Sequence, residues 1–413
     1  MTDASSDSTT ILFGAFDRHN FGDMLFAHIV ARMLPGHRLR FAGLAERDLR
    51  TYGGHFVESI STLASACRGQ TVDIVHAGGE LLTCDAWEAA VMLSSAQQAK
   101  SIIGEQAAWK NEPVEWAQAH LGLSTRAPYV LSRALFPQAR RMLFNAVGGV
   151  DLDRRDSAMR AQVIEALGLA TDVTVRDSLT RNLLAAAGIE TRLLPDPAVM
   201  TAALFGEDVR HRAEAEPVSA IRHTCPNGYI AVQFSADFGD DRTLNDIASQ
   251  LDIAARSRGL GVAFFAAGAA PWHDDLEAYE RTRQRMRTSS VRVLNSANIW
   301  DICALIANSR IYCGSSLHGR IVAAAFGLPR VNVRHPARTE PRSKQNAFAQ
   351  TWEDPAMPAE IDVGLMARGI DDALRVDRAQ LQRLAMTLVQ TYQRGFARVP
   401  AILARIDMGT QSQ

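Results

Sequence analysis

A short polar segment late in the chain carries the side chain best suited to proton transfer. Residues 312–329 read as an apolar run, a polar loop, a stretch of small residues and a glycine-proline stop, which predicts a strand, a tight loop and a helix. This order places His318 at the helix N-terminus. Histidine titrates near neutral pH and helix N-termini attract anions, so the segment could move a proton beside a bound phosphate. The neighbouring candidates for substrate binding are Ser315, Ser316, Gly319 and Arg320.

Three earlier segments also place glycine or polar residues directly after predicted strands. Residues 14–23 form a polar loop before a helical pattern, residues 75–82 contain a glycine pair, and residues 175–184 begin with an arginine. In open α/β sheets, ligands bind at the carboxyl ends of the strands, so these segments are expected to face a ligand. Their candidates for substrate binding are Asn20, Gly22, Asp23, Gly78, Gly79 and Arg176.

Each of these segments also has a purely structural interpretation. Asp23 could simply cap its helix while Gly22 permits the turn, and Asp177 could cap the helix that follows Arg176. A single histidine such as His318 is more often a packed core residue than a catalyst. The position of the loop at a sheet edge favours the functional interpretation.

The spacing of metal-ligating residues does not indicate a metal site. The five cysteines are scattered without a CxxC pair, which argues against both a zinc site and a disulfide framework. His273, Asp274 and Asp275 stand together on a predicted loop, where we expect them to face solvent or contact a sugar. We therefore predict no metal.

Composition and charge exclude several classes of protein. The 413 residues carry a formal net charge of -1, so the overall charge does not favour binding to nucleic acid. Any site for an anion must then depend on a local cluster of positive charge. The first ten residues lack the basic start and apolar centre of a secretory signal, and no apolar run is long enough to span a bilayer. We expect a cytoplasmic protein; peripheral membrane contact stays open, and no pattern indicates an oligomeric state.

Apolar runs alternate with stretches of helical spacing, which predicts an α/β fold with parallel sheets. An N-terminal Rossmann-like domain is expected over 1–210, with a helical insertion at about 83–138. A second Rossmann-like domain with terminal helices is expected over 211–413, and an interdomain linker over 205–227, where apolar periodicity is lost. The predicted strands are 11–16, 72–76, 141–147, 172–175, 192–194, 229–234, 261–265, 291–294, 309–313 and 330–333.

Taken together, the four polar segments resemble the polysaccharide pyruvyltransferase family. An N-x-G-D loop appears as residues 20–23, a glycine pair as 78–79, an R-D followed by a P-D-P turn as 176–177 and 195–197, and an S-x-x-H-G helix start as 315–319. The resemblance runs from about 11 to 344 and is thin across 83–138. It implies two Rossmann-like domains in a GT-B-like arrangement.

The resemblance also implies a reaction. Phosphoenolpyruvate and a sugar diol would give a pyruvate ketal and phosphate, on a glycan or lipid-linked precursor in cell-surface or exopolysaccharide biosynthesis. Protonation of the methylene carbon creates an oxocarbenium-like centre that two hydroxyls attack in turn, so one general acid is needed. His318 would be that acid. No cofactor is implied, because phosphoenolpyruvate is a donor substrate.

One departure from the family pattern affects the donor site. Many members carry an arginine two residues before the histidine, but this chain has Ser316. Anion binding would then rely on backbone N–H groups, serine hydroxyls and an arginine such as Arg176, Arg320 or Arg334. Two alternatives stay open: a GT-B-like glycosyltransferase that uses a nucleotide-sugar, and a non-catalytic homologue that binds a glycan or phosphate.

Overall fold

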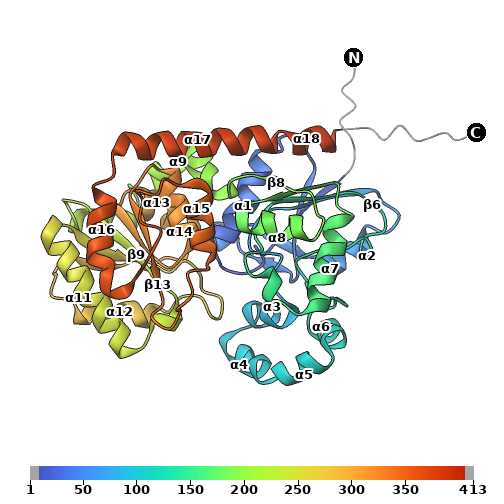
Figure 1. Cartoon of the computed structure of the whole chain (residues 1–413), viewed down its shortest axis with the longest axis horizontal. Coiled ribbons are helices and arrows are strands. Elements are labelled where there is room, and N and C mark those ends of the chain that lie inside the picture. Colours follow the sequence, from blue (N-terminus) through green and yellow to red (C-terminus); the bar gives the residue numbers. More distant parts are fainter. Residues whose placement is uncertain (1–8, 405–413) are drawn as a thin grey trace, which may run out of the picture.

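The computed structural model describes residues 9–404 of the chain (Figure 1). The first eight residues, which belong to the polar start discussed above, lie outside this range. Two sheets, each with helices packed against it, account for most of the described chain.

The first sheet has eight strands in the order β3-β4-β2-β1-β5-β6-β7-β8. All neighbours are parallel except the short pair β3 and β4. Its central strands are buried on both faces, which explains their continuous apolar runs. The strands are β1 Thr9–Phe13, β2 Leu39–Gly43, β3 Arg47–Asp48, β4 Phe56–Ser59, β5 Val72–His76, β6 Ala139–Val147, β7 Asp172–Val175 and β8 Arg192–Leu193.

The second sheet has six parallel strands in the order β11-β10-β9-β12-β13-β14. Parallel neighbours require crossover connections, and helices supply them. The strands are β9 Tyr229–Gln233, β10 Gly261–Phe264, β11 Val291–Val293, β12 Ile311–Gly314, β13 Arg330–Arg334 and β14 Glu360–Asp362.

The helices of the first half include a group that projects from the sheet (Figure 1). Helices α3 to α6 occupy residues 86–121 and share a small core of Trp109, Trp116 and alanines, whereas 122–138 contain neither helix nor strand. The helices are α1 Phe21–Arg32, α2 Ile60–Ala66, α3 Ala86–Leu93, α4 Ala96–Gly104, α5 Gln106–Asn111, α6 Pro113–Leu121, α7 Ser157–Gly168 and α8 Ser178–Ala186. The short 3₁₀ turns are η1 Arg50–Tyr52, η2 Leu152–Arg154 and η3 Pro197–Met200.

The segment predicted as a linker is largely helical. Helices α9 (Thr201–Arg212) and α10 (Val218–Thr224) cover most of it. Among its apolar residues, Val209, Val218 and Ile221 are buried in the large core that both halves share. Charged residues cover the outer faces of both helices, and these apolar residues are widely spaced. The segment is therefore helical although its sequence shows no clear apolar periodicity.

The second half contains the remaining helices and ends in a long helix that returns to the first sheet (Figure 1). Tyr392 and Asn145 form a 2.8 Å hydrogen bond, and Arg192 donates to the carbonyl of Gly395 at 3.1 Å. The helices are α11 Asp241–Arg258, α12 Leu276–Arg285, α13 Ile299–Ala307, α14 Leu317–Ala325, α15 Lys344–Trp352, α16 Met366–Leu374, α17 Arg378–Phe396 and α18 Arg398–Leu403, with η4 Ala236–Phe238 and η5 Val363–Leu365.

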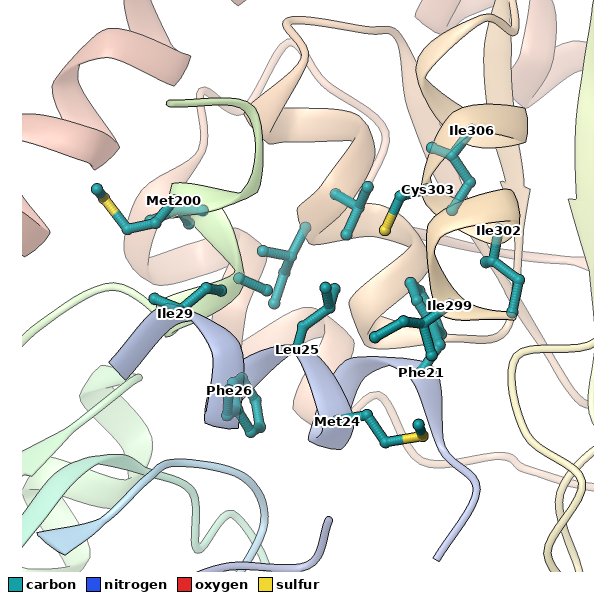
Figure 2. Packing of buried hydrophobic residues seen from close by; sticks show 14 of the residues in the cluster. Phe21, Met24, Leu25, Phe26, Ile29, Met200, Ile299, Ile302, Cys303 and Ile306 are labelled. Carbon is teal, nitrogen blue, oxygen red and sulfur yellow. The ribbon is translucent and has the colours of Figure 1, made fainter. Parts of the chain in front are cut away.

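Helix α1 joins the two halves through a continuous apolar core. Figure 2 shows Phe21 of α1 beside Ile299 of α13, Leu25 in the middle of the cluster, and Ile29 at the other end of α1 near Met200 of η3. All of these side chains are buried. Because interiors pack as densely as organic crystals, this contact fixes how the halves meet.

The contact of α17 with the first sheet gives a stability prediction. A Cβ on Gly395 would lie 1.9 Å from Cδ2 of the buried Leu194, whereas nothing lies within 4 Å of the corresponding position at Gly206 in α9. We expect Gly395→Val to lower the free energy of unfolding by about 1–3 kcal/mol through overpacking. Gly206→Val is the matched control and should stay within about 0.5 kcal/mol. Equal melting temperatures for the two variants would contradict the close packing.

Candidate active site between the two sheets

A cavity of about 730 Å³ lies between the two halves at the carboxyl ends of their strands. Residues after β1, β7 and β12 reach it, as expected for open α/β sheets. Its volume is in the range of small-molecule sites. The predicted site residues that line it are Asn20, Asp23, Arg176, Ser315, Ser316 and His318.

Three helices begin at this cavity. Asn20 caps α1 by accepting from the N–H groups of Gly22 and Asp23, Ser316 caps α14 by accepting from Gly319, and Ser343 caps α15. All three capping residues line the cavity. The positive ends of the three helix dipoles therefore face one space, which favours an anionic ligand.

His318, the second residue of α14, packs against α1 of the first half. A Cβ on Gly22 would lie 1.9 Å from His318 Nδ1, so only glycine fits there. Phe26 packs edge-on to the imidazole at 5.2 Å. The imidazole Nε2 is buried without a hydrogen-bond partner and lies 3.8 Å from Asp196 Oδ2. A buried, unpartnered nitrogen at a cavity wall is a ready contact for a ligand.

Burial holds the pKa of His318 well below 6.5, and the positive charges of Arg176 and Lys344 lower it further. The imidazole is therefore neutral at pH 7 in the unliganded protein. A bound anion would oppose both cations and raise this pKa.

Arg176, which follows β7, is the buried cation beside His318. Its guanidinium donates to Asp196 at 2.9 Å and to Glu80 at 2.6 Å, and only 2% of its surface is exposed. A Cβ on Gly148 would lie 2.4 Å from Glu80, so the chain after β6 leaves room for this ion pair. The arrangement holds Arg176 in one position at the cavity wall.

Lys344, the first residue of α15, adds a second cation. Its surface is exposed to the cavity, and the surrounding protein lowers the pKa of the ammonium; Arg176 lowers it further, while Glu80 and Asp23 oppose this. A lysine beside Arg176 and three helix N-termini is a further contact for a phosphate or carboxylate.

Gln233, at the end of β9, positions the start of α14. Its Oε1 accepts from the N–H of Ser316 at 2.8 Å, and its Nε2 donates to Asp274 at 2.7 Å. Asp274 also accepts from the N–H of Ala267, and burial raises its pKa to about 7. The loop after β10 and the start of α14 are thus connected by one side chain.

The structure does not place Arg320 in the cavity. Its side chain has no exposed surface and is paired with Glu353, with further bonds to Asn332 and the carbonyl of Ala359. Two residues along a helix turn by about 200°, so Arg320 points away from the side occupied by His318. The prediction that it binds substrate is wrong. Arg334, in contrast, lines the cavity while bonded to Asp362 at 2.6 Å.

The four candidate glycines pack beside the cavity and do not line it. Gly22 accommodates His318, and Gly319 lies against the ring of Tyr312, to which a Cβ would approach within 2.4 Å. Gly78 and Gly79 adopt positive φ values of 123° and 102°, so their role is backbone geometry near Phe26. The structure thus gives each of them a packing or backbone role, and their contact with substrate stays a prediction.

Several lining residues were not among the predicted site residues. Lys344 and Gln233 lie outside the four polar segments. Asp196, which accepts from the lining residue Arg176 without itself lining the cavity, belongs to the 195–197 turn of the family resemblance. His273 and Asp274 were expected to face solvent or contact a sugar. Both line the cavity, and Asp274 accepts a hydrogen bond from Gln233. A polar residue ending a buried apolar strand was the available signal for Gln233.

Within residues 9–404, no group of three or more histidine, cysteine or acidic side chains is arranged to hold a metal ion. In the same range, none of the helices combines the length and apolar character that crossing a membrane requires.

Comparison with known proteins identifies both a family and a fold. A statistical model of the family described as polysaccharide pyruvyl transferase matches residues 127–335, just over half of the chain. No curated protein matches the sequence. UDP-GlcNAc 2-epimerase from Neisseria meningitidis, bound to UDP-GlcNAc, superposes with a TM-score of 0.55 at 10% identity, covering 96% of this chain and 100% of that one.

A second solved structure, Anabaena Alr3699/HepE in complex with UDP-glucose, gives a TM-score of 0.53 at 11% identity and covers 95% of this chain and 99% of its own. At such identities the superpositions establish the fold alone. They confirm the predicted class of two Rossmann-like domains in a GT-B-like arrangement.

The surroundings of His318 predict its charge state. Because the folded pKa lies below the unfolded value of 6.5, the folded chain binds fewer protons, and stability is lost as pH falls below about 6.5. We expect the ring-nitrogen NMR shifts of His318 to report a neutral imidazole at pH 6.0. His318→Gln identifies the resonance and should make the melting temperature less sensitive to acid. An imidazolium spectrum at pH 7 would contradict this electrostatic account.

Proposed function

Since the chain belongs to the polysaccharide pyruvyl transferase family, we propose that it transfers the pyruvyl group of phosphoenolpyruvate to two hydroxyls of a sugar. The products are a cyclic ketal and inorganic phosphate. The acceptor is a glycan or a lipid-linked glycan precursor of the cell surface, modified in the cytoplasm.

The observation that carries the proposal is the unpartnered Nε2 of His318, an imidazole whose pKa is lowered by the positive charges of Arg176 and Lys344. Phosphoenolpyruvate carries a phosphate and a carboxylate, which match two cations and the converging helix N-termini. Ser316, where many family members have arginine, keeps its place as the cap of α14. In this chain Arg176 and Lys344 supply the positive charge.

Proton transfer follows from the charge state of His318. Binding of the anionic donor raises the pKa of the imidazole, which takes up a proton and delivers it to the methylene carbon of the donor. The C2 cation that results is attacked by one sugar hydroxyl. Loss of phosphate with its bridging oxygen regenerates a cation at C2, and the second hydroxyl closes the ketal.

The charges balance across these steps. One proton enters at the methylene carbon, and the two hydroxyls together release two, one of which restores His318 and the other of which leaves to the phosphate or solvent. Arg176 and Lys344 stabilise the departing phosphate. Asp196, 3.8 Å from His318 Nε2, orients the imidazolium once it forms.

The first test is a proton balance on binding. We expect phosphoenolpyruvate to bind more tightly than a UDP-sugar and to take up protons at pH 7, because the bound anion raises the pKa of His318. Calorimetry in buffers of different ionisation enthalpy measures this uptake, and His318→Gln should reduce it. Tighter binding of UDP-glucose or UDP-GlcNAc than of phosphoenolpyruvate would instead support a nucleotide-sugar glycosyltransferase.

The second test is turnover. We expect His318→Gln and His318→Ala to lower phosphate release in the presence of a sugar acceptor by about 10²–10⁴-fold, because neither side chain can donate a proton near pH 7. His211→Gln, an exposed histidine on α9, is the control and should retain full activity. Near-normal turnover by His318→Gln would rule out the acid role. Binding of phosphoenolpyruvate without phosphate release by the wild type would identify a non-catalytic homologue.

A further inference from the structure

Two tryptophans from different halves of the chain meet beside the cavity. Trp272 lies on the loop between β10 and α12, and Trp87 lies on α3 of the projecting helices. Their ring centroids are 5.3 Å apart with planes inclined by 51°. Trp272 lines the cavity and remains 48% exposed, whereas Trp87 is half-buried and donates from its indole to the carbonyl of Ile102.

The backbone at Trp272 is held in an unfavourable conformation. Its φ of 67° is rare for a bulky side chain, costs about 1–3 kcal/mol, and persists only where the surroundings impose it. The surroundings do so: the N–H of His273 donates to Ala270, and its carbonyl accepts from Ala236 at 2.7 Å. The fold thus fixes a large apolar ring where water can reach it, and core packing does not explain this position.

The same loop connects Trp272 to the proposed reaction centre. The neighbouring His273 contacts the Asn20 side chain at 2.9 Å, and Asn20 caps the helix whose Gly22 lies against His318. His318 is only 9% exposed, so Trp272 stands nearer to solvent in the same cavity. The anionic donor belongs at the buried end, which leaves the aromatic end for the second substrate.

Polar groups surround this aromatic end. Glu88, which follows Trp87 on α3, is bonded to Arg155 at 2.8 Å, and both line the cavity with Asp151. A flat π-face beside carboxylates and guanidinium groups matches a pyranose ring, which has one face of C–H groups and a rim of hydroxyls.

We infer that Trp272, supported by Trp87, forms the acceptor subsite, on which a pyranose ring of a glycan stacks while its diol reaches towards His318. The reaction assigned to this sugar rests on the proposed function, but its binding to Trp272 does not. The two halves each contribute one tryptophan, so the subsite exists only in the assembled two-domain chain.

Trp272→Gly is the decisive variant, because glycine adopts a positive φ without strain and removes the ring. Binding of lactose and cellobiose, without donor, is followed by saturation-transfer NMR and by tryptophan fluorescence. We expect the variant to bind at least one of these sugars about tenfold more weakly than wild type, with an unchanged affinity for phosphoenolpyruvate and an unchanged or higher melting temperature. Trp272→Phe should restore part of the affinity. Phe56→Ala, which removes an aromatic ring of similar exposure outside the cavity, should match wild type.

The outcomes separate this inference from the proposed function. Sugar binding that depends on Trp272, in a protein that releases no phosphate from phosphoenolpyruvate, keeps the subsite and rejects the pyruvyl transfer. Equal sugar affinity of wild type and folded Trp272→Gly, or no binding of either sugar by the wild type, overturns the subsite. In an active enzyme, the variant should raise the acceptor KM while leaving kcat and the donor KM within about twofold.

Discussion

The contact between Gly22 and the imidazole of His318 is the constraint on which the site depends. It brings the N-termini of α1 and α14 together across the two halves, and the shared core around Phe21, Leu25 and α13 holds them there. A side chain at position 22 could be accommodated only by separating the helices or displacing the imidazole. Separation of the helices would move apart Asn20, Ser316 and Arg176, which line the cavity together. Fold stability and site geometry therefore depend on the same packing.

The charged side chains around the cavity largely balance one another in the unliganded protein. Arg18, Arg176 and Lys344 are opposed by Asp23, Glu80 and Asp196, so the helix dipoles provide the remaining positive potential. An anionic donor that binds beside Arg176 and Lys344 would oppose their charges and raise the pKa of His318. In the proposed reaction, protonation of His318 would add one positive charge when the donor arrives, so the acid would form only when there is a substrate to protonate.

The sequence revealed the parts of this architecture that depend on local pattern. Buried parallel strands are apolar runs, and the loops after them carry the capping residues Asn20 and Ser316, so fold class and several lining residues could be predicted. Short strands such as β2 and β14 were missed because they are only partly buried over most of their length and contain charged residues, so they do not form a continuous apolar run. Lys344 reaches the cavity through tertiary packing, which no spacing near His318 could indicate. The helical spacing itself separates Arg320 from His318, because two residues along a helix turn by about 200° and so point to nearly opposite sides.

The substitution of serine for the arginine common at position 316 fits this arrangement. Ser316 accepts from the N–H of Gly319, while its own N–H donates to Gln233. An arginine there would lose a cap that stabilises the helix by about 0.5–2 kcal/mol, and would add a guanidinium to a wall that already contains Arg176 and Lys344. With serine at this position, the positive charge at the cavity comes instead from Arg176, which follows β7, and from Lys344 at the start of α15. The proposed anion site is thus distributed over both halves, so its geometry would depend on their mutual position more strongly than that of a site built on one loop.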